Sequence, residues 1–322
     1  MNPISRRLVL AVLGVGTIPA AIGQVFPARS LRIVVPFAAG GVGDLTARAV
    51  AAGLAERLGQ PVVIDNRPGA GGVVAGDTVA RAEPDGHTLF LMSNGTAVTA
   101  SLFKTLPYDT LADFVPVSTL GFFDIAVLVP ADSPHRTLAQ LLAHARAHPG
   151  QLNIGSINIG STQHLAAELF KSSAAIDAQV VPFNGTPALI TALRGRQVDA
   201  GVEILGPALP QVRAGALRVL AVTGERRSAV LPDVPTAVES GVQGFVASSW
   251  NALALPARTP RAVVDRLQRD LVAVLATPGV QQQLRALNVE PRASTPEQAS
   301  ALLKTDIERW RAVIERAGIP RQ

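Results

Sequence analysis

The sequence of 322 residues contains no cysteine. This absence excludes disulfide bridges, thiolate nucleophiles, iron–sulfur clusters and zinc sites with cysteine ligands. The length is sufficient for one large or two medium domains with a substantial core. A hydrophobic content of 48%, together with charges of both signs, excludes a disordered chain.

Aromatic residues are scarce, at 4% with a single tyrosine. The net charge of +5 and the pI of 10.5 would suit a nucleic-acid-binding protein. The basic residues are scattered, however, and beyond the N-terminal segment the longest basic cluster is the pair Arg226-Arg227. Nucleic-acid surfaces need a basic stripe interleaved with aromatic side chains. We therefore expect no nucleic-acid partner.

Long hydrophobic runs are missing after the N-terminus. The one early run, at 8–18, is too short to span a bilayer. It follows two arginines and precedes Ala21-Ile22-Gly23, so residues 1–23 are predicted to be a cleavable signal peptide, of the Sec or the twin-arginine type. Removing them lowers the net charge to +3. Export of a cysteine-free chain predicts a periplasmic location.

Glycine and proline are abundant, with 28 and 24 residues, and they separate short hydrophobic segments. Strands are predicted at 31–35, 61–64 and 88–92, with helices at 44–58 and 73–82 between them. This βαβαβ order predicts a parallel sheet flanked by helices.

A second α/β set is predicted after an irregular, proline-containing connector at 105–120. Its strands lie at 125–129, 152–155, 180–183, 198–202 and 217–222, and its helices at 138–148, 162–173 and 187–194. Helices return at 260–276, 279–287 and 296–317. We predict two α/β lobes, the second (125–222) inserted into the first (24–124 and 223–322), with a small-molecule cleft between them.

Two loops each follow a strand and open a helix. They are Pro36-Phe37-Ala38-Ala39-Gly40-Gly41-Val42-Gly43-Asp44 and Gly155-Ser156-Ile157-Asn158-Ile159-Gly160-Ser161-Thr162-Gln163-His164. Glycines allow close backbone approach, and helix-start amides suit a carboxylate. Neither loop has the spacing or the lysine of a nucleotide site. Ordinary turns with ordinary helix caps are the alternative. Facing each other across a cleft, the two loops would hold one ligand.

The sequence shows few arrangements of residues that are typical of an enzyme active site. His144 and His148 are four residues apart, but no glutamate follows His144 as in H-E-x-x-H, so both are expected on a solvated face and no metal site is predicted. His164 has Ser156 or Ser161 as its candidate nucleophile, yet the sequence lacks a G-x-S-x-G elbow. No catalytic residue is predicted.

The two loops and a series of further motifs resemble the Bug family, the extracytoplasmic solute receptors of tripartite tricarboxylate transporters. The matching segments are Leu31 to Asp44, Leu58 to Gly72, Pro84-Asp85-Gly86-His87-Thr88-Leu89, Leu106-Pro107-Tyr108-Asp109, Asp113-Phe114-Val115-Pro116-Val117, Gly155 to His164, Leu231-Pro232-Asp233-Val234-Pro235-Thr236, and Trp250 with Pro256 and Thr259-Pro260. The resemblance covers residues 30–320, and the combination is specific although each motif alone is not.

The resemblance implies a type II periplasmic-binding fold, a two-lobed Venus flytrap, without cofactor. It also implies that both loops hold a carboxylate, partly through ordered waters. The contacts it implies are Phe37, Ala38, Ala39, Gly40, Gly41 and Asp44 from one lobe, Ser156, Gly160, Ser161, Thr162 and His164 from the other, and Ser93 and Gly95 after the third strand.

Three positions depart from the family pattern. Phe183-Asn184-Gly185 stands where relatives carry Tyr-Arg-Gly or Tyr-Lys-Gly, Val202-Glu203 replaces Phe-Asp, and Thr99-Ala100 replaces Asn-Pro. Asn184 and Glu203 therefore join the candidate site, although Glu203 also suits a purely structural role. Asn184 replaces a cationic residue of the family, whereas Glu203 keeps an acidic one. Burying each unpaired carboxylate of a ligand would therefore cost free energy. A monocarboxylate, amino acid or aromatic acid is expected over a tricarboxylate, with an amine or amide near Glu203.

The expected function is capture of a small carboxylate in the periplasm by lobe closure. Delivery would be to the membrane permease of a tripartite transporter or to a sensor protein, and the receptor is expected to be a monomer. Two alternatives stay open at this point. One is a secreted α/β hydrolase or esterase that uses Ser161 or Ser156 with His164, and the other is a module that binds a protein partner and no solute.

Overall fold

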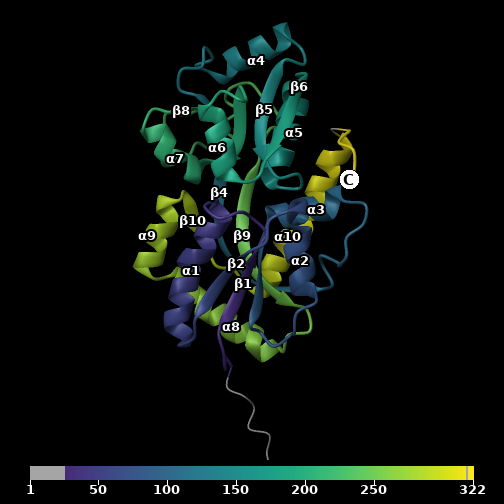
Figure 1. Cartoon of the computed structure of the whole chain (residues 1–322), viewed down its shortest axis with the longest axis vertical. Helices are drawn as coiled ribbons and strands as arrows, with labels where there is room; N and C mark the ends of the chain where they lie inside the picture. Colours follow the sequence, from purple (N-terminus) through teal and green to yellow (C-terminus); the bar gives the residue numbers. More distant parts are fainter. Residues whose placement is uncertain (1–25, 317) are drawn as a thin grey trace, which may run out of the picture.

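The computed structural model describes residues 26–316 and 318–322. The predicted signal peptide at 1–23 lies outside these residues. Figure 1 shows two α/β lobes stacked along the long axis of the molecule and joined by long strands. Within the described part of the chain, none of the helices has both the length and the apolar character needed to cross a membrane.

The lower lobe in Figure 1 begins with the predicted βαβαβ unit. Its elements are β1 (Leu31–Val35), α1 (Val42–Leu58), β2 (Val62–Asn66), η1 (Ala70–Gly72), α2 (Val73–Ala80) and β3 (Thr88–Ser93). β1 pairs in parallel with β2 on one side and with β3 on the other, which confirms the predicted parallel sheet. Gly59 ends α1 in the left-handed conformation that favours glycine, with φ of 67°.

The upper lobe repeats this architecture. It contains α4 (Leu138–Ala147), β5 (Leu152–Ile157), α5 (Thr162–Ala174), β6 (Ala178–Phe183), α6 (Thr186–Arg194), β7 (Ala200–Ile204), α7 (Leu205–Arg213) and β8 (Leu217–Val222). β5 is parallel to both β6 and β7. The carboxyl ends of β5 and β7 therefore lie side by side, and α5 and α7 begin there.

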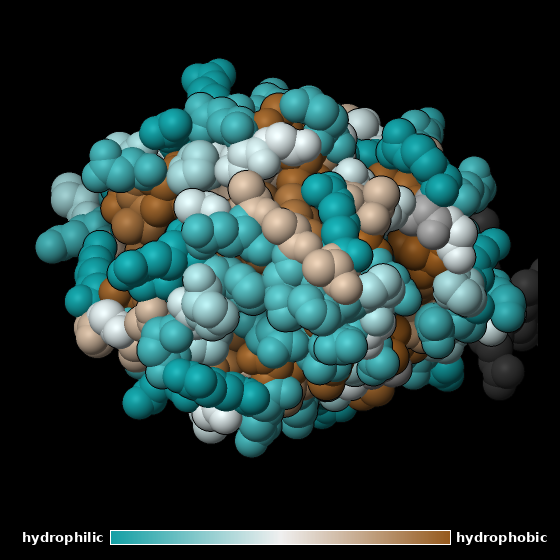
Figure 2. All heavy atoms as spheres, turned by 90° about the horizontal axis from the view of Figure 1, so that it is seen from above, coloured by the Kyte–Doolittle hydropathy of each residue, from teal (hydrophilic) through white to brown (hydrophobic). Residues whose placement is uncertain are grey.

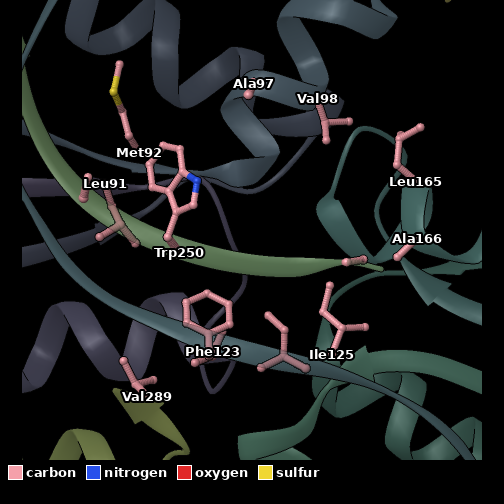
Figure 3. Close-up of a cluster of buried hydrophobic side chains, with 14 of the residues drawn as sticks. Leu91, Met92, Ala97, Val98, Phe123, Ile125, Leu165, Ala166, Trp250 and Val289 are labelled. Atoms are coloured by element: carbon pink, nitrogen blue, oxygen red, sulfur yellow. The ribbon is translucent and has the colours of Figure 1, made fainter. Parts of the chain in front are cut away.

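Two long strands connect the lobes. β4 (Phe114–Pro130) pairs with β9 (Ser248–Pro256) in its first part and with β7 and β8 in its last part. The resulting order is β2-β1-β3-β9-β4-β7-β5-β6, so one sheet runs through both lobes. Figure 3 shows Trp250 on β9 and Phe123 on β4 within the buried core at this junction. The exact residue boundaries of the lobes stay a prediction.

The C-terminal elements return to the lower lobe (Figure 1). They are α8 (Arg261–Leu275), α9 (Pro278–Ala286), β10 (Val289–Pro291) and α10 (Pro296–Arg316). A buried polar network attaches α10 to the lobe: the Asp306 carboxylate accepts hydrogen bonds of 2.6 Å from both the Trp250 indole and the Asn94 amide. The Asn94 carbonyl in turn accepts one of 2.8 Å from Trp310.

The predicted irregular connector at 105–120 was partly wrong, because β4 already begins at Phe114. Pro116 suggested an irregular segment, but the register of β4 against β9 shifts directly after it and again before Gly121, and such bulges accommodate proline in a strand. The sequence also missed α3 (Asn94–Leu102), α7 and β9. α7 was missed because it contains prolines, including Pro210 in its interior.

Candidate functional site

A narrow cavity with about 20 Å³ of water-accessible space lies between the two lobes. Its lining comes from both lobes and from the connecting strands: Phe37, Ala38, Gly41, Val42, Gly43, Ser93, Phe123, Ile157, Asn158, Thr162, Gln163, Gly185, Thr186, Ile204, Ser249 and Asn251. Apolar walls with a few polar groups suit a small organic ligand.

Five helices begin at this cavity. α1, α3, α5, α6 and α7 each place a residue of the helix cap or first turn in its wall. The first backbone N–H groups of a helix have no partner within the helix, and its N-terminus carries partial positive charge. The cavity therefore provides a positive potential although no arginine, lysine or histidine lines it.

Three of the five helix starts are left without a side-chain cap. Gly41 precedes α1, Gly185 precedes α6 and Ile204 precedes α7, and none of them caps its helix through a side chain. By contrast, the hydroxyls of Ser93 and Ser161 accept hydrogen bonds from first-turn amides of α3 and α5. The uncapped amides are suited to an anion such as a carboxylate.

The loop before α1 is held in place by Asp44. The Asp44 carboxylate accepts hydrogen bonds from the Gly40 N–H at 2.9 Å, the Asn66 amide at 3.0 Å and the Arg48 guanidinium at 3.0 Å. Burial raises the pKa of Asp44, but these hydrogen bonds outweigh burial and hold the pKa below its usual value. Asp44 thus positions the loop from behind the cavity wall.

The structure places the predicted site residues in two groups. Phe37, Ala38, Gly41, Ser93 and Thr162 line the cavity. The others lie around it: Ala39 and Gly40 on the exposed side of the loop, Gly95 in α3, Ser156 in β5, Gly160 and Ser161 before α5, His164 in α5, Asn184 exposed before α6, Glu203 buried in β7, and Asp44 in α1. Their roles toward a ligand stay predictions.

Several lining residues were not predicted. Ser249 and Asn251 belong to β9, which the sequence did not reveal, and Ile204 precedes the missed helix α7. Thr186 follows Gly185 at the start of α6, where the Gly-Thr-Pro sequence is a recognisable helix start and was the available signal.

The geometry of Ser161 and His164 is that of a helix cap. The Ser161 hydroxyl donates to the Ile157 carbonyl at 3.0 Å and accepts from the backbone N–H of His164 at 3.1 Å. The His164 Nδ1 atom has no hydrogen-bond partner among the described residues, and burial lowers the pKa of the ring. The Ser156 hydroxyl contacts only the Ile157 carbonyl, at 3.4 Å. No nucleophile–base pair is formed by these residues.

Glu203 is fully buried directly behind the cavity wall. One carboxylate oxygen accepts hydrogen bonds from the Gln163 amide at 2.8 Å and from the Ile204 N–H at 2.7 Å. Burial raises the pKa of Glu203 to about 7, against the opposing effect of these hydrogen bonds. Because Gln163 lines the cavity, Glu203 sets the orientation of one of its polar groups.

Replacing Glu203 with glutamine is expected to change how stability depends on pH. The folded-state pKa lies above the ordinary value of 4.5, so the folded protein binds more protons than the unfolded chain between pH 4.5 and about 7. The free energy of unfolding therefore falls as pH rises through this window, by roughly 3 kcal/mol, and then levels off. Glu203→Gln should abolish this decline in urea unfolding measured from pH 5 to 8. Glu308→Gln, at an exposed position, is the control. Parallel curves of stability against pH for wild type and Glu203→Gln would contradict the raised pKa of Glu203.

The lobes touch at the edge of the cavity through two glycines. A Cβ atom on Gly160 would lie 2.8 Å from the Cα of Gly71 in the other lobe. The Thr99 hydroxyl donates to the Gly71 carbonyl at 2.7 Å and lies 3.3 Å from the Gly160 carbonyl. Side chains larger than hydrogen at these glycines would hold the lobes apart.

Replacing Gly160 with alanine should therefore weaken ligand binding by opposing closure of the lobes. Both Gly160 and Gly150 have positive φ, 84° and 75°, so alanine at either position is expected to cost about 1 kcal/mol of folding stability. Only Gly160 faces the opposite lobe; the Cβ of Gly150→Ala would find its nearest neighbour at 3.5 Å. Calorimetry should show roughly tenfold weaker binding for Gly160→Ala alone. Equal affinities of the two variants would show that this contact does not influence closure.

Comparison with known proteins decides the family. The family model described as "Tripartite tricarboxylate transporter family receptor" matches residues 46–319. The chain belongs to this family. These receptors are solute-binding proteins rather than enzymes, which agrees with the capping geometry of Ser161 and removes the hydrolase alternative.

Individual receptors of the family are similar over nearly their whole length. Protein BugT of Bordetella pertussis is 35% identical over 96% of this chain and 97% of its own. The solved structure of R. palustris Rpa4515 with adipate is 33% identical, with a TM-score of 0.88 over 92% of this chain and 99% of that one. MatC from Rhodopseudomonas palustris with bound malate is 34% identical, with a TM-score of 0.86 over 90% and 100%. The structure of the periplasmic binding protein BugD has a TM-score of 0.88 at 31% identity, over 92% and 100%. The two-lobed periplasmic-binding fold predicted from the sequence is thereby confirmed.

Proposed function

We propose that this receptor is exported to the periplasm and captures a small ligand with one carboxylate between its lobes. The observation that carries the proposal is the convergence of five helix N-termini on a cavity lined by no cationic side chain. Backbone amides and helix dipoles can hold one carboxylate. Two related receptors were solved with the dicarboxylates adipate and malate, which supports a carboxylate as the group that is bound.

A second and third carboxylate would find no cationic side chain in the lining. The lining offers hydroxyls, amides and apolar groups, and Glu203 lies buried behind Gln163. Burying a charge without a partner is unfavourable. Monocarboxylates, amino acids or aromatic acids are therefore favoured over tricarboxylates, with an amine or amide of the ligand directed to the side of Gln163 and Glu203.

A carboxylate panel tests this proposal. The purified protein is screened by thermal shift and then by calorimetry against alkyl and aromatic monocarboxylates, amino acids, adipate, malate and citrate. A monocarboxylate, amino acid or aromatic acid should raise the melting temperature most, since binding to the folded state stabilises it by mass action. Citrate binding far more tightly than any of these would overturn the proposal.

Delivery of the ligand to a membrane partner would depend on closure of the two lobes. The ligand stabilises the arrangement in which Gly71 contacts Gly160, and this closed surface would be recognised by the membrane permease or by a sensor protein. On the face seen in Figure 2 the hydrophobic atoms are divided into separate small areas within a mainly hydrophilic surface. This surface suits a monomer that meets its partner transiently.

A further inference from the structure

Asn251 is a buried side chain of the cavity wall whose hydrogen-bonding groups are both unused. It is 1% exposed, and neither its amide nitrogen nor its carbonyl oxygen has a partner among the described residues. Among the buried asparagine and glutamine side chains that the structure describes, Asn251 alone has both atoms unpartnered. The similarly buried Asn94, by comparison, bonds through both atoms, to Asp306 and Trp310.

The residues around Asn251 in the sheet do not pair with its side chain. β9 lies between β3 and β4, so the Asn251 backbone is part of a central strand. Directly opposite on β3 is Ser93, and two residues earlier on β9 is Ser249. All three line the cavity, as expected for residues on one face of a sheet. The hydroxyl of Ser93 already caps α3, and that of Ser249 lies 3.4 Å from the Thr162 hydroxyl.

We infer that Asn251 recognises a neutral group of the ligand that carries a donor and an acceptor side by side, such as a carboxamide. An asparagine amide offers two N–H donors and one carbonyl acceptor, and a carboxamide complements both. A second carboxylate would use only the donors, would leave the Asn251 carbonyl unpaired, and would meet no cationic side chain in the lining. The inference rests on the proposed carboxylate-receptor function and names the chemistry of the end of the ligand opposite to the carboxylate.

Ligands of matched shape test which chemical group Asn251 recognises at the end opposite to the carboxylate. Succinamate, succinate and levulinate share one carboxylate and a similar shape, and differ in carrying a carboxamide, a second carboxylate or a methyl ketone at the other end. Homologues with one and two further methylene groups cover different cavity lengths. Wild-type protein should bind the best half-amide roughly tenfold more tightly than the ketone of the same length, because the ketone provides no donor to the Asn251 carbonyl. It should also prefer the half-amide over the diacid.

Two variants should shift this preference in opposite directions. Asn251→Leu keeps the side-chain shape and removes both polar groups, so half-amide and ketone should bind within about twofold of each other. Asn251→Asp keeps an acceptor and loses the donor, so the half-amide should be favoured over the ketone by more than in wild type. Asn153→Leu, at the start of β5 outside the cavity, is the control and should leave all affinities unchanged.

The outcomes separate this inference from the function on which it rests. A wild-type affinity ratio of half-amide to ketone near one, a preference for the diacid, or a ratio that Asn251→Leu leaves unchanged overturns the role of Asn251 while leaving a carboxylate receptor. Absence of binding by every carboxylate of both panels overturns the receptor proposal itself, and the inference with it. The melting temperature of each variant identifies any loss of folding, and Asn251→Asp keeps the test valid if Asn251→Leu fails to fold.

Discussion

Gly41→Asp is expected to reduce carboxylate affinity about 100-fold or more while the protein stays folded. Gly41 precedes α1 in an extended conformation, with φ of −82° and ψ of 168°, which any residue adopts. Aspartate is a preferred residue at this position because its carboxylate accepts hydrogen bonds from the free first-turn amides. The introduced carboxylate would thus occupy the amides proposed for the ligand. At about 4 Å it would also repel a ligand carboxylate by roughly 4 kcal/mol at an intermediate dielectric constant.

The test of this prediction uses two further variants at the same position. A Cβ atom at Gly41 would lie 3.4 Å from the Thr186 hydroxyl, so some affinity is lost to crowding alone, which Gly41→Ala measures. Gly41→Asn adds a cap without charge and should fall between the two. Calorimetry with the tightest carboxylate of the panel gives the affinities, and thermal unfolding should show Gly41→Asp at least as stable as Gly41→Ala. If Gly41→Asp binds within a few fold of Gly41→Ala, the α1 N-terminus does not hold the carboxylate.

Asp306→Leu should destabilise the fold by about 2–6 kcal/mol, because it leaves two buried neutral donors without an acceptor. The Asp306 side chain is buried between α10, β9 and α3, where one of its oxygens accepts from both Trp250 and Asn94 at 2.6 Å. Leucine has a similar shape but accepts nothing. The Trp250 indole and the Asn94 amide would then be buried donors without a partner, each with a desolvation cost of about 1–3 kcal/mol.

Asp265→Leu provides the matched control. Asp265 lies on α8, where its partly exposed carboxylate forms an ion pair with Arg261 at 2.8 Å. Exposed pairs of this kind contribute about 0–1 kcal/mol, so the control variant should unfold close to wild type. Guanidinium unfolding followed by tryptophan fluorescence and by circular dichroism measures both variants. Similar losses in the two would show that the α10 network contributes no more than a surface pair.

Local sequence patterns were sufficient for the short strand–loop–helix units of each lobe. The strand at 31–35, the helix that follows it and the strand–loop–helix around 152–173 have clear hydrophobic patterns and glycine or serine boundaries, and the structure confirms them. The loops predicted to face each other do so, since Phe37, Gly41 and Thr162 line one cavity. The strands, helices and loops themselves depend on interactions within about twenty residues of chain, which local pattern reports well.

The full extent of the strands that connect the lobes was not predictable from local sequence patterns. β4 contains Pro116 and Gly121, and its continuation depends on bulges against β9, whose residues lie more than a hundred positions later. α7 persists with Pro210 inside it because β7 and β4 position it on the upper lobe. Pairing partners distant in the chain override local propensity, and a single sequence does not reveal them.

The sequence by itself determined the absence of thiol chemistry, the two α/β units, the family resemblance and the two glycine-containing helix starts. These follow from composition and short-range pattern. Only the tertiary structure decided that five helix starts share one cavity, that Asp44 and Ser161 support its loops from outside it, and that Asn251 stands in its wall without a partner. The physical reason is that hydrogen-bond satisfaction depends on every neighbour a group meets in space, and those neighbours come from β9, α6 and α7, whose places are set by sheet pairing rather than by local sequence.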